Sequence, residues 1–199
     1  LMYDENTKIL QDELKKLNLS IISIQKEDII LLKELFNIYG IQYIEADTEA
    51  EIICSQLSKQ NIVDGCLSDD TDILANGSKI FLTGYNYKNN TLIKYDYESI
   101  LKNLKLTNIE FVDLCILCGC DYTTKINKIG YITAYKYIKQ YKTIENIIDN
   151  IKSIDKYCIN ESFLNNFKYQ ESRDIFLKID YKLPELNLDE RDMNSEKLK

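Results

Sequence analysis

A short apolar run leads directly into three acids in the stretch Gly65-Cys66-Leu67-Ser68-Asp69-Asp70-Thr71-Asp72-Ile73-Leu74. The run from 62 to 67 predicts a buried strand, and no linker separates it from the acids. In an open parallel α/β sheet, ligands bind at the carboxyl ends of the strands. Carboxylates crowded at such a point stay ionised together only when a positive group neutralises them. Since Mg²⁺ prefers oxygen ligands, the stretch predicts half of a divalent-metal centre, and our working hypothesis is a nuclease.

The composition is that of a globular protein. A length of 199 residues fits one domain, or one domain with appendages, and the 45% hydrophobic content with a single proline excludes a disordered chain. No apolar run reaches the roughly 18 residues that span a bilayer. Residues 1–6 show no signal-peptide pattern. We therefore expect a soluble intracellular protein that works in the nucleus, the cytoplasm or a viral replication site.

The chain contains no histidine. This excludes histidine general bases, Ser-His-Asp triads and histidine-ligated zinc. The chemistry must then rest on carboxylates, lysine, tyrosine, cysteine or a metal. The net charge of −7 argues against a protein that wraps nucleic acid without specificity, unless the acids gather at a metal site and the lysines lie elsewhere.

Six cysteines leave two interpretations open. The pattern Cys115-x-x-Cys118-x-Cys120 occurs in zinc and iron–sulfur sites. Cys115 and Cys118 also share one face of an apolar helical run, where a reduced cysteine packs as a small hydrophobic residue. We favour core packing, because no second cysteine pair has a matching spacing. The remaining cysteines are Cys54, Cys66 and Cys158.

The order of the predicted elements indicates an α/β domain. Strands alternate with helices in the first half of the chain, which favours a mostly parallel sheet flanked by helices, and helices alone follow as a cap. The expected helices are 7–18, 23–39, 47–60, 71–76, 97–104, 107–118, 132–141, 143–151 and 161–177, and the expected strands are 41–44, 62–67, 79–82 and 91–95.

Two pairs of acids share one spacing. They are Glu49-x-Glu51 and Asp70-x-Asp72. Residues two apart do not face each other on a regular helix, so a pair that serves one site must lie where the backbone turns. Both pairs lie at predicted strand-to-helix junctions. Asp121, directly after a predicted helix end, is the fifth candidate.

Each acid also has a purely structural interpretation. Thr48 to Glu51 fits a capping box, in which Glu51 bonds the amide of Thr48. Ser68 or Asp69 fits the cap of the following turn, with Asp70 and Asp72 favoured near its positive end. The spacing alone leaves both interpretations open.

Three stretches together resemble the internal region of the structure-specific 5′ nucleases, the flap endonuclease family. They are 41–51, 68–74 and 111–122, and they are followed by Ile129-Gly130 and a helix from 134 to 140. Their order is that of the family, and the resemblance covers about residues 25–180. It implies a PIN-like 5′-nuclease fold and Mg²⁺-dependent cleavage of 5′-flap or related branched DNA in replication and repair.

The resemblance implies that the five acids are both the metal ligands and the catalytic residues: Glu49, Glu51, Asp70, Asp72 and Asp121. The implied cofactors are two Mg²⁺ ions, for which Mn²⁺ can substitute. Two such ions about 4 Å apart activate the attacking water and stabilise the leaving oxygen. This chemistry needs neither a covalent intermediate nor a histidine.

The segment from 125 to 141 resembles the helix–two-turn–helix with which the family holds duplex DNA. Backbone amides at a turn and at a helix start can bind phosphates there, and lysines can add charge. The family pattern is Gly-x-Gly-Pro, whereas this chain has Lys128-Ile129-Gly130-Tyr131. The resemblance also implies a K⁺ ion at this turn. The candidate DNA-binding residues are Lys125, Lys128, Gly130 and Lys136.

Two departures from the family concern the ends of the chain. Residues 1–40 do not resemble the family's N-terminal region, which carries two further metal-binding acids and a helical gateway. We see no sliding-clamp motif in the C-terminal tail. We therefore expect a missing N-terminal nuclease half as a partner. The expected segments are 1–24 as the tail of the helical arch, 25–118 as the internal nuclease domain, 119–152 as the duplex-binding module, and 153–199 as a helix and polar tail.

Other functions remain open at this point. One is a non-catalytic fragment of the same fold that binds DNA or a partner protein. Another is a relative that prefers 5′→3′ exonuclease, bubble or Holliday-junction substrates. A small RNA-cleaving domain with a similar acidic cluster would lack the duplex-binding segment from 125 to 141.

Overall fold

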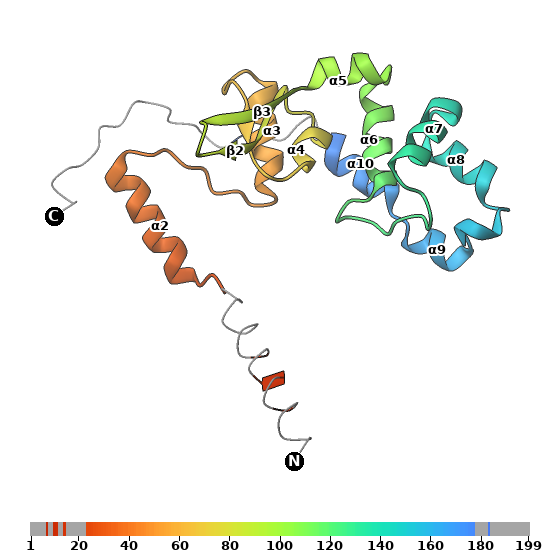
Figure 1. Ribbon diagram of the computed structural model, residues 1–199, viewed down its shortest axis with the longest axis horizontal. Coiled ribbons are helices and arrows are strands. Elements are labelled where there is room, and N and C mark those ends of the chain that lie inside the picture. Colours follow the sequence, from red (N-terminus) through yellow and green to blue (C-terminus); the bar gives the residue numbers. More distant parts are fainter. Residues whose placement is uncertain (1–6, 8–9, 12–13, 15–22, 178–182, 184–199) are drawn as a thin grey trace. The chain divides into compact units, whose positions relative to one another are not determined.

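The computed structural model describes residues 7, 10, 11, 14, 23–177 and 183 (Figure 1). The predicted helix 7–18 and the polar tail lie largely outside these residues. The chain divides into two compact units, and helix α2 belongs to one while Glu45–Glu185 forms the other. No helix in the described part of the chain is both long and apolar enough to cross a membrane. The predicted segment boundaries stay predictions.

Helix α2 (Lys26–Tyr39) has both of its ends defined by capping interactions. The amide of Gln25 donates to the Asp28 carboxylate over 2.8 Å and thereby closes a capping box. Gly40 ends the helix in the left-handed conformation, with φ of 69°, which glycine adopts without a steric penalty. The predicted helix 23–39 is therefore confirmed over most of its length.

The predicted strand 41–44 is not formed. Residues 41–46 have no regular structure, although Ile41 and Tyr43 give the segment the apolar alternation of a strand. Both side chains are exposed. A strand exists only where a neighbouring strand accepts its hydrogen bonds, and alternation cannot show whether such a neighbour is present.

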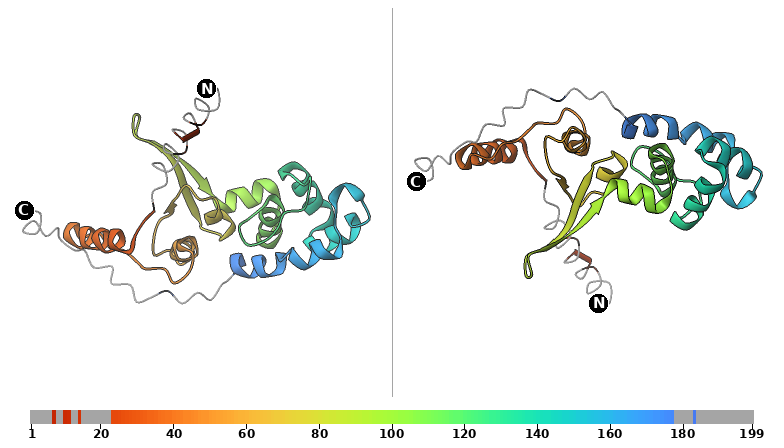
Figure 2. Two further views of the ribbon diagram at one scale, coloured as in Figure 1. Left: turned by 90° about the horizontal axis from the view of Figure 1, so that it is seen from below. Right: turned by 90° about the horizontal axis from the view of Figure 1, so that it is seen from above.

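A three-stranded mixed sheet supports the acidic stretch. β1 (Cys66–Leu67) pairs in parallel with β2 (Ile80–Asn86), which pairs antiparallel with β3 (Thr91–Asp96). The β2–β3 hairpin projects well beyond the short β1 (Figure 2). Cys66, Ile73 and Phe81 form a small buried cluster between the sheet and helices α3 (Ala50–Lys59) and α4 (Asp72–Ala75). The α/β class is confirmed. The expected mostly parallel sheet is instead a mixed one in the described residues, in which the β1–β2 pair is parallel and the longer β2–β3 pair is antiparallel.

The second half of the described chain is helical around a larger apolar core. Helix α6 (Asn108–Cys118) lies at its centre and packs against α7 (Tyr131–Tyr141) and α10 (Tyr169–Leu177) (Figure 1). Its start is fixed by a capping box between Thr107 and Glu110. The other elements are α5 (Tyr97–Leu104), α8 (Ile144–Ile151), the 3₁₀ turn η1 (Asp155–Tyr157) and α9 (Glu161–Asn166).

The predicted single helix 161–177 is wrong, because the chain breaks it into α9 and α10. Phe167 leaves the helical conformation, with φ of −86° and ψ of 82°. Its ring is buried and packs against the rings of Phe163 and Tyr169. Burial of this ring outweighs the continuation of the helix, and the apolar periodicity alone did not indicate the break.

The cysteines are free thiols. Cys115, Cys118 and Cys120 pack against the larger core. Burial is the main reason that the pKa of Cys115 rises to about 12. These environments favour core packing over the metal-site interpretation of the cysteine pattern.

Candidate metal centre

Asp72 is the point at which the five candidate acids meet. Its side chain is half-buried at the start of α4. Burial raises the pKa of Asp72, and the charges of four other carboxylates raise it further. In order of decreasing effect these belong to Asp70, Asp121, Glu51 and Glu49. The structure thus brings all five predicted acids within electrostatic reach of one carboxyl group, although they come from three separate segments of the chain.

A tight turn between β1 and α4 positions Asp70 and Asp72. The amide of Asp70 donates to Ser68 Oγ over 3.0 Å, and the amide of Asp72 donates to Asp70 Oδ1 over 2.8 Å. The amide of Ser68 donates to the carbonyl of Leu82 over 3.0 Å, which ties the turn to the sheet. Asp70 therefore has a structural role through one oxygen, while Oδ2 is left for other partners.

Glu49 and Glu51 lie at the start of α3. Glu49 is the extended residue before the helix, and no side chain caps this helix end. The alternative of a Thr48–Glu51 capping box is wrong, because the helix begins at Ala50 and Glu51 is only its second residue. Neither glutamate side chain forms a hydrogen bond or ion pair with another described residue, and neither caps the helix.

Asp121 follows the end of α6. Gly119 stops the helix with φ of 115°, a conformation that a residue with a Cβ rarely adopts, and the exposed Asp121 comes two residues later. Tyr122 was missed at the sequence level as a neighbour of the cluster. Burial and the charges of Asp72 and Glu49 raise its pKa to about 12, and its ring packs on Phe176 with centroids 5.4 Å apart.

The donor set fits a hard divalent cation by its chemistry. All five donors are carboxylates, and the mutual repulsion at Asp72 is what a bound cation would relieve. Within the described residues, no three acids or cysteines are already gathered at metal-ligand distances. The cluster is thus a region of crowded negative charge rather than a closed cage.

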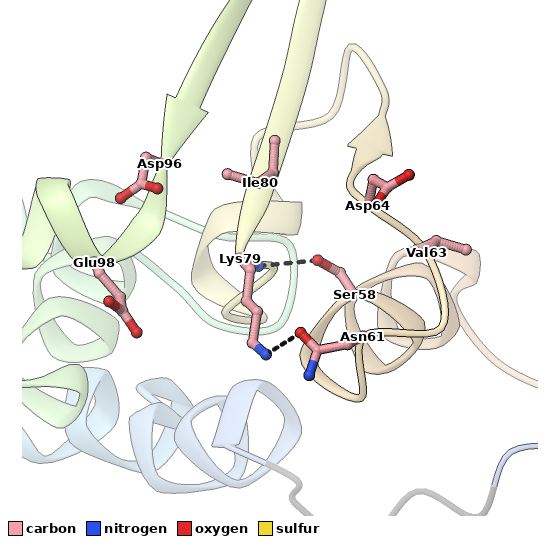
Figure 3. A pocket seen from close by; sticks show the side chains of 8 residues that line it. All are labelled: Ser58, Asn61, Val63, Asp64, Lys79, Ile80, Asp96 and Glu98. Carbon is pink, nitrogen blue, oxygen red and sulfur yellow. Dashed lines mark hydrogen bonds between the residues drawn. The ribbon is translucent and has the colours of Figure 1, made fainter.

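A separate hollow of about 360 Å³ lies away from these acids (Figure 3). At its wall, the amide of Lys79 donates to Ser58 Oγ over 3.1 Å, and the Lys79 ammonium bonds Asn61. Lys79 precedes β2, which runs parallel to β1, so the hollow lies at the amino end of β1, opposite the acidic turn. None of the five candidate acids lines it. The lining residues are Ser58, Asn61, Val63, Asp64, Lys79, Ile80, Asp96 and Glu98.

The turn before α7 has the conformation that the missing glycine would favour. Lys128 adopts the left-handed region with φ of 58°. Ile126 and Ile129 are buried on either side of it, and the amide of Ile129 donates to the carbonyl of Ile126 over 3.3 Å. At Gly130, by contrast, a Cβ would meet no atom within 4 Å. The turn is thus anchored by isoleucines rather than permitted by glycines.

The four candidate DNA-binding residues are all exposed: Lys125, Lys128, Gly130 and Lys136. Lys128 and Gly130 lie together in the turn, and Lys136 lies on α7. Lys125 instead extends along the end of α6, where its Cδ would lie 3.4 Å from a Cβ at Gly119. The turn and α7 therefore bring three of the four residues into one local segment.

A buried ion-pair network, which the sequence did not reveal, joins three helices. Arg173 on α10 donates from Nε and Nη2 to the two oxygens of Asp113 on α6, over 2.7 and 2.9 Å. It also donates from Nη1 and Nη2 to Glu145 on α8, over 2.9 and 3.1 Å. Asp113 is fully buried, and its Oδ2 also accepts the amide of Ile144 over 3.2 Å.

The pKa values of the two carboxylates shift in opposite directions, although Arg173 lowers both of them. Burial raises the pKa of Asp113, despite the hydrogen bonds from Arg173 that lower it. Hydrogen bonds from Arg173 are the main reason that the pKa of Glu145 lies below its ordinary value. The difference arises because Glu145 is 39% exposed and keeps part of its hydration, whereas Asp113 keeps none.

Glu145→Gln should make the stability of the protein less dependent on pH in the acid range. Because the folded pKa of Glu145 is below the ordinary value of 4.5, its contribution is complete above that pH and is lost as the pH falls through the folded pKa. We expect urea denaturation to show a constant difference in unfolding free energy between parent and variant at pH 6–7, and a shrinking difference below pH 4.5. A difference that grows on acidification would contradict the assignment.

Comparison with known proteins places the acidic cluster within a recognised region. Residues 40–121 match the family described as the XPG I-region. Flap endonuclease 1-2 of Paramecium tetraurelia is 39% identical over 168 residues, which cover 79% of this chain and 41% of that protein. Flap endonuclease 1 of Plasmodium falciparum is 36% identical over 199 residues, which cover 88% and 30%. The chain spans less than half the length of these relatives.

Solved structures support the same fold. The catalytic core of Rad2 in complex with a DNA substrate gives a TM-score of 0.75 at 25% identity, covering 96% of this chain and 66% of that one. The flap endonuclease-1 from Methanococcus jannaschii gives 0.61 at 23% identity, covering 77% and 44%. The second likeness is one of fold alone. Together they confirm the predicted PIN-like nuclease fold.

Proposed function

Since the chain belongs to the flap endonuclease family of 5′ nucleases, we propose that it supplies the internal part of a structure-specific nuclease that cuts branched DNA carrying a 5′ flap. The observation that carries the proposal is the convergence of four carboxylates on Asp72. A cluster of this kind, in a chain without histidine, suits phosphodiester hydrolysis that depends on a divalent metal.

The proposed ligands and catalytic residues are Glu49, Glu51, Asp70, Asp72 and Asp121. Mg²⁺ ions held there, or Mn²⁺ in their place, supply an activated water and a positive charge for the leaving oxygen. Asp72 is the central ligand in this proposal, because every other acid acts on it. Asp70 holds the turn with one oxygen and offers the other to the site.

The duplex is held, in this proposal, by the turn around Lys128 and by α7. The exposed amides at the start of α7 can bind phosphate oxygens, and Lys128 and Lys136 add positive charge on the same segment. Contacts of this kind recognise the backbone of DNA and carry no sequence information. They suit a nuclease that selects its substrate by shape. The K⁺ ion at this turn remains a prediction from the resemblance.

Lys128→Gly should separate the charge of Lys128 from its backbone conformation. Glycine adopts φ of 58° without steric cost, so we expect the unfolding free energy to rise by about 1 kcal/mol. The same variant lacks one phosphate contact, so the salt dependence of duplex binding should fall by about one unit of slope. Urea denaturation and fluorescence anisotropy from 50 to 200 mM salt measure the two effects. Lys152→Gly on the exposed end of α8 is the control for general charge loss.

The direct test is cleavage of a labelled 5′-flap duplex by this chain in Mg²⁺ and in EDTA. Bubble, Holliday-junction and blunt duplex substrates at the same concentration test whether the chain prefers a 5′ flap to other DNA structures. We expect Mg²⁺-dependent cutting at the base of the flap. Because the chain spans less than half of its relatives, the assay is repeated with the N-terminal region of a flap endonuclease added. DNA binding without cutting in both assays would favour a non-catalytic fragment.

A further inference from the structure

Arg173 bonds two carboxylates, Asp113 and Glu145, that lie on helices leading to the two proposed functional segments. It is the only arginine among the described residues, in a chain whose other described basic residues are lysines. Four hydrogen bonds of 2.7–3.1 Å satisfy its guanidinium from both sides. A lysine has no planar fork and cannot bind two carboxylates in this paired manner. The position therefore requires the geometry of arginine and not merely its charge.

One arm of this network leads to the acidic cluster. Asp113 lies on α6, and the same helix continues to Gly119 and then to Asp121. The side chain of Asp113 is fully buried, so its place in the fold is set by Arg173 and by the amide of Ile144. Any shift of α6 against α10 would break two short hydrogen bonds at once.

The other arm leads to the segment that we propose holds the duplex. Glu145 is in the first turn of α8, which packs against α7. The turn with Lys128 lies directly before α7. Since α7 and α8 follow one another in the chain and pack together, they form one hairpin of helices. Ile144, the first residue of α8, gives its amide to Asp113. The two carboxylates thus connect the start of the α7–α8 hairpin to the helix that precedes Asp121.

We propose that Arg173 is a positioning residue that fixes the distance along the DNA between the duplex-binding segment and the acidic cluster. The inference rests on the proposed function. Arg173 and Glu145 together determine which phosphodiester of the DNA lies at the acidic cluster. A shift of about 1 Å in such a distance can cost about a hundredfold in rate, so the network would affect where the strand is cut more than whether DNA is bound.

Glu145→Ala is the decisive variant, because it removes one arm and leaves Asp113 paired with Arg173. Glu145 is 39% exposed, so its loss leaves no buried charge without a partner. The matched control is Asp149→Ala, which removes an acid from the same helix. Asp149 is 68% exposed, and its ion pair within the described residues is with Lys152, three positions on, over 2.8 Å. Both variants change the net charge equally.

The readout is the position of cutting at single-nucleotide resolution on a 5′-flap duplex, together with the dissociation constant for the same DNA. We expect Glu145→Ala to lower the rate at the main position by about tenfold to a hundredfold, to move product to neighbouring positions, and to leave DNA affinity within about threefold. Asp149→Ala should match the parent in all three measurements. A Glu145→Ala protein that cuts more slowly at an unchanged position would overturn the proposal, since a merely stabilising role gives that result.

Fe²⁺ with ascorbate separates this proposal from the proposed function. Fe²⁺ bound at the acidic cluster reduces added hydrogen peroxide to hydroxyl radical and hydroxide, and ascorbate returns the Fe³⁺ to Fe²⁺. The radicals cut nearby DNA without hydrolysis, so the position of the DNA relative to the acids is visible even in a chain that is inactive in Mg²⁺. A broadened radical-cutting pattern in Glu145→Ala, but not in Asp149→Ala, supports the proposal. An unchanged pattern overturns it while the function stands. Failure of the parent chain to bind flap DNA overturns the function, and this inference with it.

Discussion

Asp72→Asn is expected to reduce Mg²⁺-dependent cleavage by about a thousandfold or more, a loss of about 4 kcal/mol in transition-state stabilisation. Asp72 lies at the start of α4, where the acidic turn ends, and its carboxyl interacts with all four other acids. Asparagine has nearly the same shape but lacks the charge that holds a hard cation. Single-turnover cleavage of a 5′-flap duplex, in the chain form that is active, measures the loss.

The same variant should make the metal-free protein more stable. The pKa of Asp72 is raised, which means that the fold disfavours its ionised form near neutral pH. Removing that charge removes the repulsion, so the melting temperature in EDTA should rise. Mg²⁺ should then stabilise the parent but not Asp72→Asn. DNA binding in EDTA should be unchanged or tighter for Asp72→Asn, and also for Asp70→Ala, because one negative charge near the phosphates is lost.

Asp69→Asn provides the matched control for this prediction. Asp69 is close in sequence and exposed, and its carboxylate accepts a weak bond from Thr83 Oγ1 at 3.4 Å. The four carboxylates with the largest effects on the pKa of Asp72 do not include it. We expect it to cleave and to respond to Mg²⁺ like the parent. Equal losses in the two variants would contradict the assignment of the metal ligands.

Arg173→Ala is expected to cost about 3–5 kcal/mol in unfolding free energy, which is a large part of the total for a domain of this size. The cost arises because Asp113, fully buried in the apolar core, would lose its charged partner. Urea denaturation at pH 7 measures it. The loss should become smaller as the pH falls, because the pKa of Asp113 is already raised by burial and a protonated Asp113 is neutral.

The double variant Arg173→Ala with Asp113→Asn tests the reason for that loss. An asparagine can be buried without a counter-charge, so the double variant should be more stable than Arg173→Ala alone. Double-mutant analysis gives the coupling between the two residues. If Asp113→Asn makes Arg173→Ala still less stable, the cost lies in lost packing of the arginine stem, and the buried charge is not its cause.

Local sequence patterns predicted most of the helices and the positions of the acids. The predicted helix 107–118 agrees with α6 within one residue, and the structure shows that a capping box between Thr107 and Glu110 starts it and that Gly119 ends it. The start and the end of a helix depend on residues only a few positions apart, so a short stretch of sequence is enough to indicate them. The spacing of the paired acids left a capping role and a shared site both open, and the family resemblance implied the shared site.

Features that depend on distant residues were not predicted. Asp113 and Arg173 are 60 positions apart, so no local pattern around Asp113 indicates its partner. The strand expected at 41–44 failed for the same reason, since strand formation depends on a neighbouring strand. The break at Phe167 was also not predicted, although its ring packs on the rings of Phe163 and Tyr169, which are only a few positions away.

The left-handed Lys128 also restricts how this turn can evolve. Asparagine adopts that conformation far more readily than β-branched residues do, and a lysine codon becomes an asparagine codon by a single-nucleotide change. A glycine codon needs more than one change from lysine, so the family's usual residue is not a direct mutational neighbour. In a saturation library at this position, glycine and asparagine should therefore be enriched for folding and lysine for DNA binding, with valine and isoleucine depleted for both.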